Sequence, residues 1–511
     1  MPGGFYTMET FSATRAKIQF SNAFFIFHVI LTMQVYCMLE LTKDGENRYR
    51  LKRYGKMAVE GIVYANDYLL PLITTDKSLQ QLANAASLPG VRGPVCGMPD
   101  MHEGFGLPIG GVMACTADGV ISAGAVGMDI NCGVRLLATG LSAGELDLPL
   151  LRRLIDRIEE YVPTGVGRNS RNREITREIF EEAVHIGPIG LVDRGFGLPD
   201  DLNKIEEGGC LPGADLDAVS SKAYKRGAVQ LGTLGGGNHF IELQVVSEVY
   251  DRAAANIFGL HPGMLTVMIH TGSRGFGHQI CSDYSKILLA AAGKHGIEIP
   301  DRGLACAPAD SQEGKDYYAA MACAVNFAFA NRQLVTHETR RAFKDVFGGG
   351  RYIPEINLIY DVAHNIAKWE KHAGQRLLVH RKGATRALPP GHKGNPAVYR
   401  HTGHPVLIPG SMGTASYVLT GTEKASESFF SVNHGAGRIL SRTAAVKEIS
   451  KEQFERSMSG VLYNSRNYKE LLDEAPGAYK DIDQVVETLA AVGMTRKVAR
   501  LVPLAVIKGK D

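Results

Sequence analysis

The stretch VGMDINCGVR, residues 126–135, places a carboxylate and a thiol three positions apart between glycines. It runs directly into VRLLA (134–138), an apolar run typical of a buried β-strand. Asp129 and Cys132 therefore lie in a glycine-flanked loop where a strand begins. Loops held by rigid strands are where proteins often present reactive side chains. This loop is thus a candidate functional site.

Similar strand-like runs recur along the chain and are separated by helical patterns. The runs are GVMAC (111–115), FIELQVV (240–246), LTVMI (265–269), INLIY (356–360), RLLVH (376–380) and PVLIP (405–409). One amphipathic helix is predicted over LPLLRRLIDRIEEYV, and a long one over DYYAAMACAVNFAFANRQLVTHETRRAF. The fold class is therefore mixed α/β. Because neither repeats nor linker composition divide the chain, we expect one domain over 38–511, with the polar stretch 196–226 as an insertion or mobile loop.

Composition excludes some classes of protein. The chain has 511 residues, of which 45% are hydrophobic, and its formal net charge is +3. This balance provides no overall field for a polyanion, so any nucleic-acid site must be a local patch. The 8 cysteines lack CxxC spacing in a chain too long to need disulfides. We therefore expect a reducing, cytoplasmic location.

Residues 1–37 need a separate interpretation. FSNAFFIFHVILTMQVYCML (20–39) is an apolar run behind Arg15 and Lys17, as in a signal peptide or a membrane helix. His28 and Gln34 weaken both interpretations, as does the lack of a small-residue cleavage site. A third interpretation, which we favour, is that 1–37 is an extra segment upstream of the true start of translation.

Four histidines lie where predicted strands meet glycine or polar residues. His239 opens a strand in GGGNHFIE, and His270 closes one in VMIHTGSRGFGH. In IYDVAHN we expect Asp361 to be a helix N-cap, which places His364 in the first helical turn. His434 precedes a glycine loop in VNHGAGR. Each histidine alone is more often a hydrogen-bonded structural residue than a ligand.

As a set, these loop residues indicate a metal site. Asp129, Cys132, His239, His270 and His364 offer a carboxylate, a thiolate and imidazoles, which suit a transition metal better than Mg²⁺ or Ca²⁺. A single cysteine without CxxC pairing disfavours a structural zinc site. We hypothesise that one thiolate bridges two metal ions.

Other loops carry groups that bind anions. The stretch HGAGRILSR contains Arg438 and Arg442 as well as His434. This combination indicates that His434 is a nucleophile or a phosphate contact. The alternative is a helix N-terminus with solvated arginines. PGSMGTASY offers the hydroxyls of Ser411, Thr414 and Ser416, although it is also an ordinary Ser- and Gly-rich turn. VHRKGATRALPPGH concentrates basic residues in the best candidate polyanion patch, or in a plain exposed loop: Arg381, Lys382, Arg386 and His392. The chain contains neither a Walker loop nor a GxGxxG motif.

Together these strings closely resemble the RtcB family of RNA ligases. From about Gly55 to Lys508 the chain carries, in the family's order, MPDMHEGFGLPIGG, GMDINCGVR, GGGNHFIE, HTGSRGFGHQ, YDVAHN, HRKGATRALPPGH, PGSMGTASY, HGAGR, EAPGAYKD and VIKG. The resemblance implies a single large RtcB-type domain with a central metal-binding cleft. It also implies two Mn²⁺ ions per chain and GTP as a substrate.

The resemblance implies a role for each candidate site residue. One Mn²⁺ would be held by Asp129, Cys132 and His239, and the other by Cys132, His270 and His364. His434 would take GMP from GTP, and we infer from the acid and histidine content of the loop around Asp100 that Asp100 orients His434. The expected guanine-nucleotide contacts are Asn238, Phe240, Glu242, Ser411, Ser416, Tyr479 and Lys508, and the expected RNA contacts are Arg438, Arg442, Arg381 and Lys382.

The implied reaction joins 2′,3′-cyclic phosphate or 3′-phosphate RNA ends to 5′-hydroxyl ends through a histidine–GMP intermediate, in tRNA splicing or RNA repair. The implied partners are RNA and an archease-type activator, with no membrane. Two alternatives remain open. The first is a metal-dependent phosphodiesterase that hydrolyses RNA ends without joining them, and the second is a nonenzymatic RNA-binding protein with a structural metal.

Overall fold

A computed structural model of the chain describes residues 39–349, 354–465 and 467–509. The extra segment 1–37 lies outside these residues. Among the residues that are described, none of the helices has the length and apolar character needed to cross a membrane.

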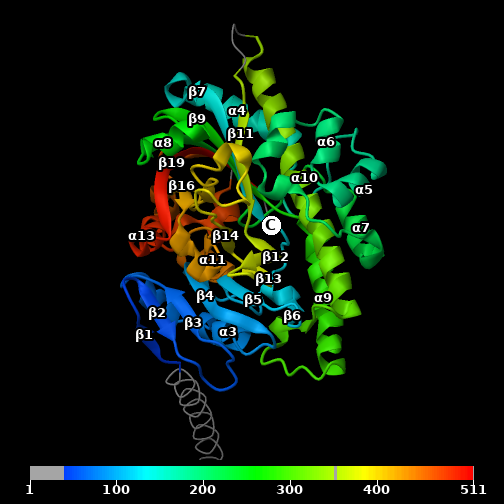
Figure 1. The fold of residues 1–511 in the computed structure, drawn as a ribbon. Coiled ribbons are helices and arrows are strands. Elements are labelled where there is room, and N and C mark those ends of the chain that lie inside the picture. The colour runs from blue at the N-terminus through cyan, green and yellow to red at the C-terminus, as the bar shows by residue number, and fades with distance from the viewer. Residues whose placement is uncertain (1–38, 350–353, 466, 510–511) are drawn as a thin grey trace, which may run out of the picture.

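Two β-sheets form the centre of the molecule (Figure 1). The larger sheet has strand order β11-β7-β9-β8-β19-β16-β15, with β18 beside β19. Its strands are β7 Gly133–Ser142, β8 Phe240–Val249, β9 Met264–Thr271, β11 Asn357–Ala363, β15 Val406–Ile408, β16 Ser416–Gly421, β18 Leu462–Tyr463 and β19 Thr495–Lys508.

The smaller sheet has seven strands in the order β1-β2-β3-β4-β5-β13-β12 and lies below the larger one in Figure 1. Its strands are β1 Leu41–Lys43, β2 Arg48–Leu51, β3 Gly61–Tyr64, β4 Val91–His102, β5 Ile109–Cys115, β12 Asn365–His372 and β13 Gln375–Lys382. Two short pairs join β6 Val120–Ser122 to β10 Cys306–Pro308 and β14 Ala384–Arg386 to β17 Ser431–Asn433.

Helices pack against both sheets and bury apolar residues there. Among the described residues the two longest are α9 Arg274–Lys294 and α10 Gln312–Phe347, along the right of Figure 1. The other helices are α2 Leu69–Thr74, α3 Ser78–Ala85, α4 Leu148–Tyr161, α5 Arg177–Ile186, α6 Ile189–Asp193, α7 Ser221–Gly227, α8 Arg252–Phe258, α11 Arg442–Glu448, α12 Lys451–Ser457 and α13 Ile482–Val492. The predicted mixed α/β class, both predicted helices and the predicted strand runs are confirmed.

One local prediction is wrong. Asp361 is not a helix N-cap and His364 is not helical, because the chain passes from β11 to β12 with His364 between them. The Asp361 carboxylate is instead fully buried, and it accepts hydrogen bonds from Nε of Arg135 at 2.9 Å and from Nε of Arg332 at 2.7 Å. An N-cap must stay beside its own backbone, whereas these arginines draw the carboxylate into the core.

Arg332 extends this buried ion cluster to the neighbouring loop. Its Nη1 donates to the carbonyls of Asn131 and Thr271, both at 2.9 Å. Close packing allows no side chain at Gly133, because a Cβ there would lie 2.4 Å from the Val362 carbonyl. The cluster therefore fixes α10, β7, β9 and β11 relative to one another.

The stretch 196–226 is not a loose insertion. Glu206 is buried, accepts a hydrogen bond from Nζ of Lys368 at 2.7 Å and forms an ion pair with Arg386 at 3.0 Å. Asp201 is buried as well and pairs with Arg340 at 2.6 Å. Short helical turns over Pro199–Lys204 and Glu206–Gly209 carry these carboxylates, so the stretch is packed into the fold.

Replacing Asp361 with alanine should destabilise the protein by about 3–5 kcal/mol, because two buried guanidinium groups would lose their counter-ion. Urea denaturation followed by circular dichroism measures the change. The control is Glu160→Ala, which breaks an exposed pair with Arg157 and should change stability by less than about 1 kcal/mol. An equal loss of unfolding free energy in the two variants would show that the buried cluster contributes no more stability than an exposed ion pair.

Candidate functional site

The predicted metal ligands meet at one edge of the larger sheet. Cys132 directly precedes β7 and His239 directly precedes β8. His270 is the next-to-last residue of β9, and His364 directly follows β11. These four strands are neighbours and antiparallel, so the start of β7 or β8 lies beside the end of β9 or β11. Residues far apart in sequence are thereby brought to one place.

The ligands form two groups that share Cys132. One group is Cys132, His270 and His364, and the other is Asp129, Cys132 and His239, with all ligand atoms of each group within 4.8 Å of one another. The Cys132 Sγ atom lies 3.3 Å from Nε2 of His239 and 3.2 Å from Nε2 of His270. The structure thus assembles the two groups in the arrangement expected from the sequence.

The hydrogen bonds of His270 favour a cation between these groups. Its Nδ1–H donates to the Asn238 carbonyl at 3.2 Å, so Nε2 carries a lone pair. That nitrogen faces Cys132 Sγ and, at 3.0 Å, Nε2 of His364. A second-shell carbonyl that fixes the tautomer in this way is typical of metal-binding histidines. The donor set therefore fits transition-metal ions.

Burial sets the charge state of the ligands when no cation is bound. It lowers the pKa of His270 and of His364 well below the ordinary value, so both imidazoles are neutral. Burial, aided by the Asp129 carboxylate, raises the pKa of the Cys132 thiol. Because cysteine binds a metal ion as the thiolate, a bound cation would have to lower the pKa of Cys132 again.

His434 stands beside the metal-ligand groups and is held by Asp100. Its ring centroid is 4.7 Å from that of His364. Its Nδ1–H donates to Asp100 Oδ2 at 2.6 Å, and the same oxygen accepts from the backbone N–H of His434 at 3.0 Å and of Gly435 at 3.2 Å. Asp100 is fully buried at the end of β4. The Nε2 atom of His434 is therefore left with its lone pair free for chemistry.

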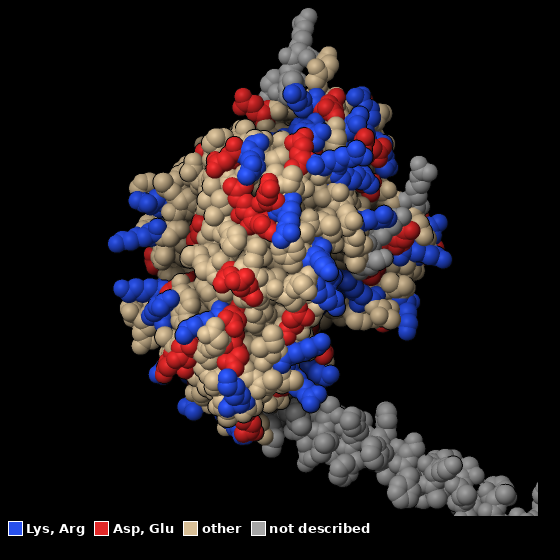
Figure 2. All heavy atoms as spheres, turned by 90° about the vertical axis from the view of Figure 1, so that its right-hand side faces the viewer, with Lys and Arg blue, Asp and Glu red and all other residues tan. Residues whose placement is uncertain are grey.

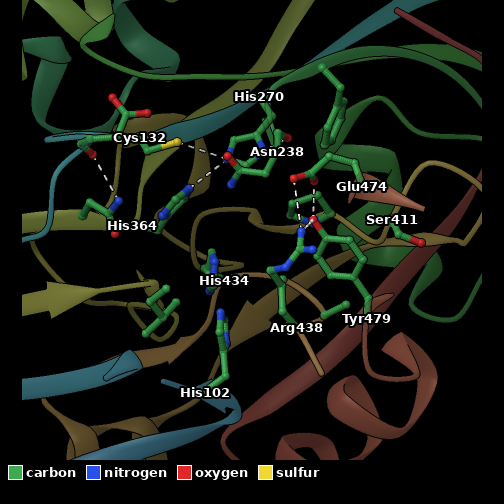
Figure 3. A pocket seen from close by; sticks show the side chains of 18 of the residues that line it. His102, Cys132, Asn238, His270, His364, Ser411, His434, Arg438, Glu474 and Tyr479 are labelled. Atoms are coloured by element: carbon green, nitrogen blue, oxygen red, sulfur yellow. Dashed lines mark hydrogen bonds and ion pairs between the residues drawn. The ribbon is translucent and has the colours of Figure 1, made fainter. Parts of the chain in front are cut away.

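A cavity of about 390 Å³ contains these groups. Figure 3 shows His434 between His364 and His102, with Arg438, Tyr479 and Glu474 grouped on the other side. Five of the seven expected nucleotide contacts line this cavity: Asn238, Phe240, Ser411, Tyr479 and Lys508.

The other two expected contacts, Glu242 and Ser416, lie behind the cavity wall. Both are buried, and the Gln244 side chain links them by donating to Glu242 at 2.7 Å and to Ser416 at 3.0 Å. Burial raises the pKa of Glu242 to about 8. The second carboxyl oxygen of Glu242 is buried without a hydrogen-bond partner among the described residues. It could accept a donor from a ligand that reaches this depth.

Glu474 organises the cationic side of the cavity. It accepts from Arg438 at 3.1 Å and from the Tyr479 hydroxyl, and it lies 3.7 Å from Nζ of Lys508. The half-exposed Arg442 approaches the same carboxylate at 3.3 Å. Burial opposes the ionisation of Glu474, but these cations still lower its pKa.

The expected basic patch over 381–392 is not a surface patch. Arg381 is buried and paired with Glu370 at 2.9 Å, and Arg386 is buried beside Glu206. Alternation along β13 turns Arg381 away from the cavity and leaves Lys382 lining it, where burial lowers the lysine pKa to about 8. The sequence shows the basic residues but not the distant carboxylates that neutralise them.

Exposed cations gather elsewhere. Lys222, Lys225 and Arg226 on α7 line a separate groove of about 490 Å³ together with Gln230. Gln230 accepts from the Gly275 N–H at the start of α9, so this groove lies close to the end of β9 that carries His270. Elsewhere on the face with α5 and α7, basic and acidic side chains are interspersed (Figure 2).

Two cavity residues were not assigned from the sequence, although their motifs were visible. Glu474 lies in EAPGAYKD and His102 in MPDMHEGFG. His102 Nδ1 donates to the Asp100 carbonyl at 2.8 Å, so Asp100 holds both His102 and His434. The local signal for His102 is the carboxylate of Asp100 two residues before it, and for Glu474 it is Tyr479 in the same motif, whereas Arg438 and Lys508 are distant in sequence.

The fold and the site define a mixed α/β protein with a candidate metal centre beside a carboxylate-held imidazole. The profile of the tRNA-splicing ligase RtcB family matches residues 81–509. The chain belongs to the RtcB family. The tRNA-splicing ligase RtcB of Thermococcus kodakarensis is 46% identical over 481 residues, which cover 92% of this chain and 99% of the relative. The RNA-splicing ligase RtcB of Mycobacterium tuberculosis is 48% identical over 438 residues, covering 84% and 100%.

Replacing Cys132 with serine should abolish the binding of Mn²⁺ to both ligand groups, because they share this sulfur. In the unchanged protein, Mn²⁺ at about a hundredfold above Kd should stabilise the fold by about 2.7 kcal/mol. Thermal unfolding and elemental analysis measure the two effects. Cys210→Ser, at a half-buried thiol outside both groups, is the control. Two ions still bound to the Cys132 variant would contradict the shared-ligand arrangement.

Proposed function

We propose that the protein is a GTP- and Mn²⁺-dependent RNA ligase that joins 2′,3′-cyclic phosphate or 3′-phosphate ends to 5′-hydroxyl ends, in tRNA splicing or RNA repair. The observation that carries the proposal is the position of His434. Asp100 holds its Nδ1 at 2.6 Å, and its ring lies 4.7 Å from His364 of the metal-ligand groups. Family membership supports the same conclusion.

The proposed cofactor is a pair of Mn²⁺ ions. Asp129, Cys132 and His239 would hold one, and Cys132, His270 and His364 the other. When bound, the ions would neutralise charge on phosphate oxygens and depress the pKa of the shared thiol.

His434 is the proposed nucleophile. Its bare Nε2 attacks the α-phosphorus of GTP, the bond to the leaving group breaks and pyrophosphate departs. The Nδ1–H proton remains on the ring, so the product is a positively charged phosphorylated imidazolium. Asp100, which already accepts from Nδ1, stabilises that charge.

The RNA phosphate then receives the guanylate. Water first attacks the phosphorus of a 2′,3′-cyclic end; the bond to the 2′-oxygen breaks and that oxygen takes up a proton, which leaves a 3′-phosphate. An oxygen of this 3′-phosphate attacks the phosphorus carried by His434 and releases the imidazole. The 5′-hydroxyl of the second strand finally attacks the activated 3′-phosphorus and GMP departs. The phosphate in the new junction therefore comes from the RNA itself.

The side chains around the cavity supply the proposed binding contacts. Asn238, Phe240, Ser411, Tyr479 and Lys508 would contact the nucleotide. Glu242 would accept hydrogen bonds from N1 and N2 of guanine, two donors that adenine does not offer. This contact requires the base to enter as far as the Glu242 side chain behind the cavity wall. Arg438, Arg442 and Lys382 line the cavity and would contact RNA phosphates, and the α7 groove would guide a strand toward them. Arg381 is too deeply buried for this role.

The proposed work on RNA would take place in the cytoplasm. The cysteines that the structure describes are free thiols, which suits a reducing compartment. A phosphodiesterase that opens RNA ends without joining them would use the same ligands. Product analysis separates the two functions, because only a ligase forms joined strands.

Replacing His434 with alanine should abolish covalent labelling by α-labelled GTP, because Nε2 is the proposed point of attachment. Denaturing electrophoresis after incubation with GTP and Mn²⁺ measures the adduct. His401→Ala, which removes an exposed histidine outside the cavity, should label normally. Persistent labelling of the His434 variant would remove this nucleophile from the proposal.

The affinity for GTP should fall as the pH drops below about 8. Burial raises the pKa of Glu242 to about 8, so the free protein carries a neutral acid there at neutral pH, whereas guanine needs the carboxylate as an acceptor. The loss should approach about tenfold for each pH unit. Calorimetric titration on both sides of pH 8 measures it. Glu242→Gln should bind GTP more weakly and without this slope, and an unchanged slope would exclude Glu242 as its source.

A further inference from the structure

A second cavity, of about 400 Å³, lies outside the proposed catalytic centre. Its walls come from the start of α10 and from the hairpin of β12 and β13. They include Tyr318, Trp369, Arg376, Lys315 and Asp310. Nothing in the proposed reaction uses these side chains.

The cavity presents aromatic surface and positive charge together. Trp369 is the only tryptophan of the sequence, and the guanidinium of Arg376 lies over its ring at 4.5 Å from the centroid. Trp369 and Tyr318 are only partly buried. Among the hydrogen bonds of the described residues, neither the indole N–H nor the Tyr318 hydroxyl has a partner. Flat rings with free polar tips suit a nucleobase.

The charges in this cavity favour an anion. Arg376 and Lys315 are exposed, and neither has a carboxylate partner among the ion pairs of the described residues. Lys315 lies in the first turn of α10, a helix of 36 residues whose N-terminal end adds positive potential. Asp310 is the only carboxylate among the wall residues and opposes these cations. The combination of stacking surface and cations is the one that binds single-stranded nucleic acid.

The hairpin runs through the interior between this cavity and the proposed catalytic centre. Ala367 and His380, which lie between the two on the shared face, are fully buried. In its register Asn365 pairs with Lys382, Trp369 with Leu378 and Lys371 with Arg376. Residues two apart on a strand share a face, so the side chains of Asn365 and Lys382 project from the same face as those of Trp369 and Arg376. Asn365 and Lys382 line the catalytic cavity. Trp369 lies four positions after Asn365 along β12, a distance of about 13 Å.

We propose that the second cavity binds a nucleotide of the RNA strand away from its reacting end. The base would stack in the space lined by Trp369 and Tyr318, and a flanking phosphate would meet Arg376 and Lys315. The inference rests on the proposed function, because it takes RNA as the substrate. It adds a recognition site that gives a long RNA strand more affinity than its reacting end provides.

Trp369 allows a direct test, because its fluorescence is the only tryptophan signal of the chain. The His434→Ala variant, which should not turn over, is titrated with a single-stranded oligoadenylate decamer. Fluorescence anisotropy of a dye on the RNA reports total binding in the same samples. We expect saturable quenching of Trp369 that follows the anisotropy, whereas AMP at equal concentration should leave the emission unchanged.

Matched variants test the stacking and charge contacts. Tyr318→Ala should weaken RNA binding by a factor between about 5 and about 150, the range for one stacked base, whereas Tyr318→Phe should bind normally. Lys315→Glu should weaken binding, but Lys344→Glu, at an exposed lysine near the other end of α10, should not. In the active protein, Tyr318→Ala should raise KM for a long RNA with kcat and guanylylation unchanged.

The possible failures are distinguishable. RNA binding by anisotropy without a change in Trp369 emission, or quenching that survives Tyr318→Ala and Lys315→Glu, would overturn this inference alone. Saturable quenching by AMP would overturn it too, by assigning the cavity to free nucleotides. If no RNA binds, both this inference and the proposed function fail.

Discussion

The buried cluster of Asp361, Arg135 and Arg332 is the constraint on which the rest of the site depends. All three side chains are fully buried, so the two guanidinium groups lose their hydration and must be compensated by the one carboxylate and by carbonyls. The backbone carbonyls of Asn131 and Thr271 compensate Arg332 by accepting hydrogen bonds from its Nη1. Asn131 is next to Cys132, and Thr271 is next to His270. The ion cluster thus determines where two of the candidate metal ligands, Cys132 and His270, lie.

The topology of the larger sheet explains why no short motif contains the whole ligand set. The four contributing strands are adjacent in space as β11, β7, β9 and β8, but they come from widely separated parts of the chain. Antiparallel pairing places their ligand-bearing ends at the same edge. Each ligand then needs only a short local signal: a polar residue where an apolar run meets a turn. The candidate ligands come together because of the strand order of the sheet.

That division explains what sequence reasoning could predict. The apolar runs located the strands and identified the residues at their ends, so the five candidate ligands and His434 were found from local patterns. The errors arose where a distant partner determines the outcome. Asp361 has the local pattern of an N-cap, but two remote arginines bury it. Arg381 and Arg386 look like a solvated basic loop, yet Glu370 and Glu206 pair with them in the interior. Local patterns show charge but not its compensation.

The two sheets contribute different parts of the proposed chemistry, and His364 joins them. Asp100, at the end of β4, belongs to the smaller sheet and orients His434, whereas the metal ligands lie at the edge of the larger sheet. Between β11 and β12 the chain crosses from the larger to the smaller sheet within one residue, since β11 ends at Ala363 and β12 begins at Asn365. His364 lies at this crossing, and its ring centroid is 4.7 Å from that of His434. A change in the angle between the sheets would therefore move His434 away from the candidate metal ligands, so the contact between the sheets is part of the geometry that the proposed function requires.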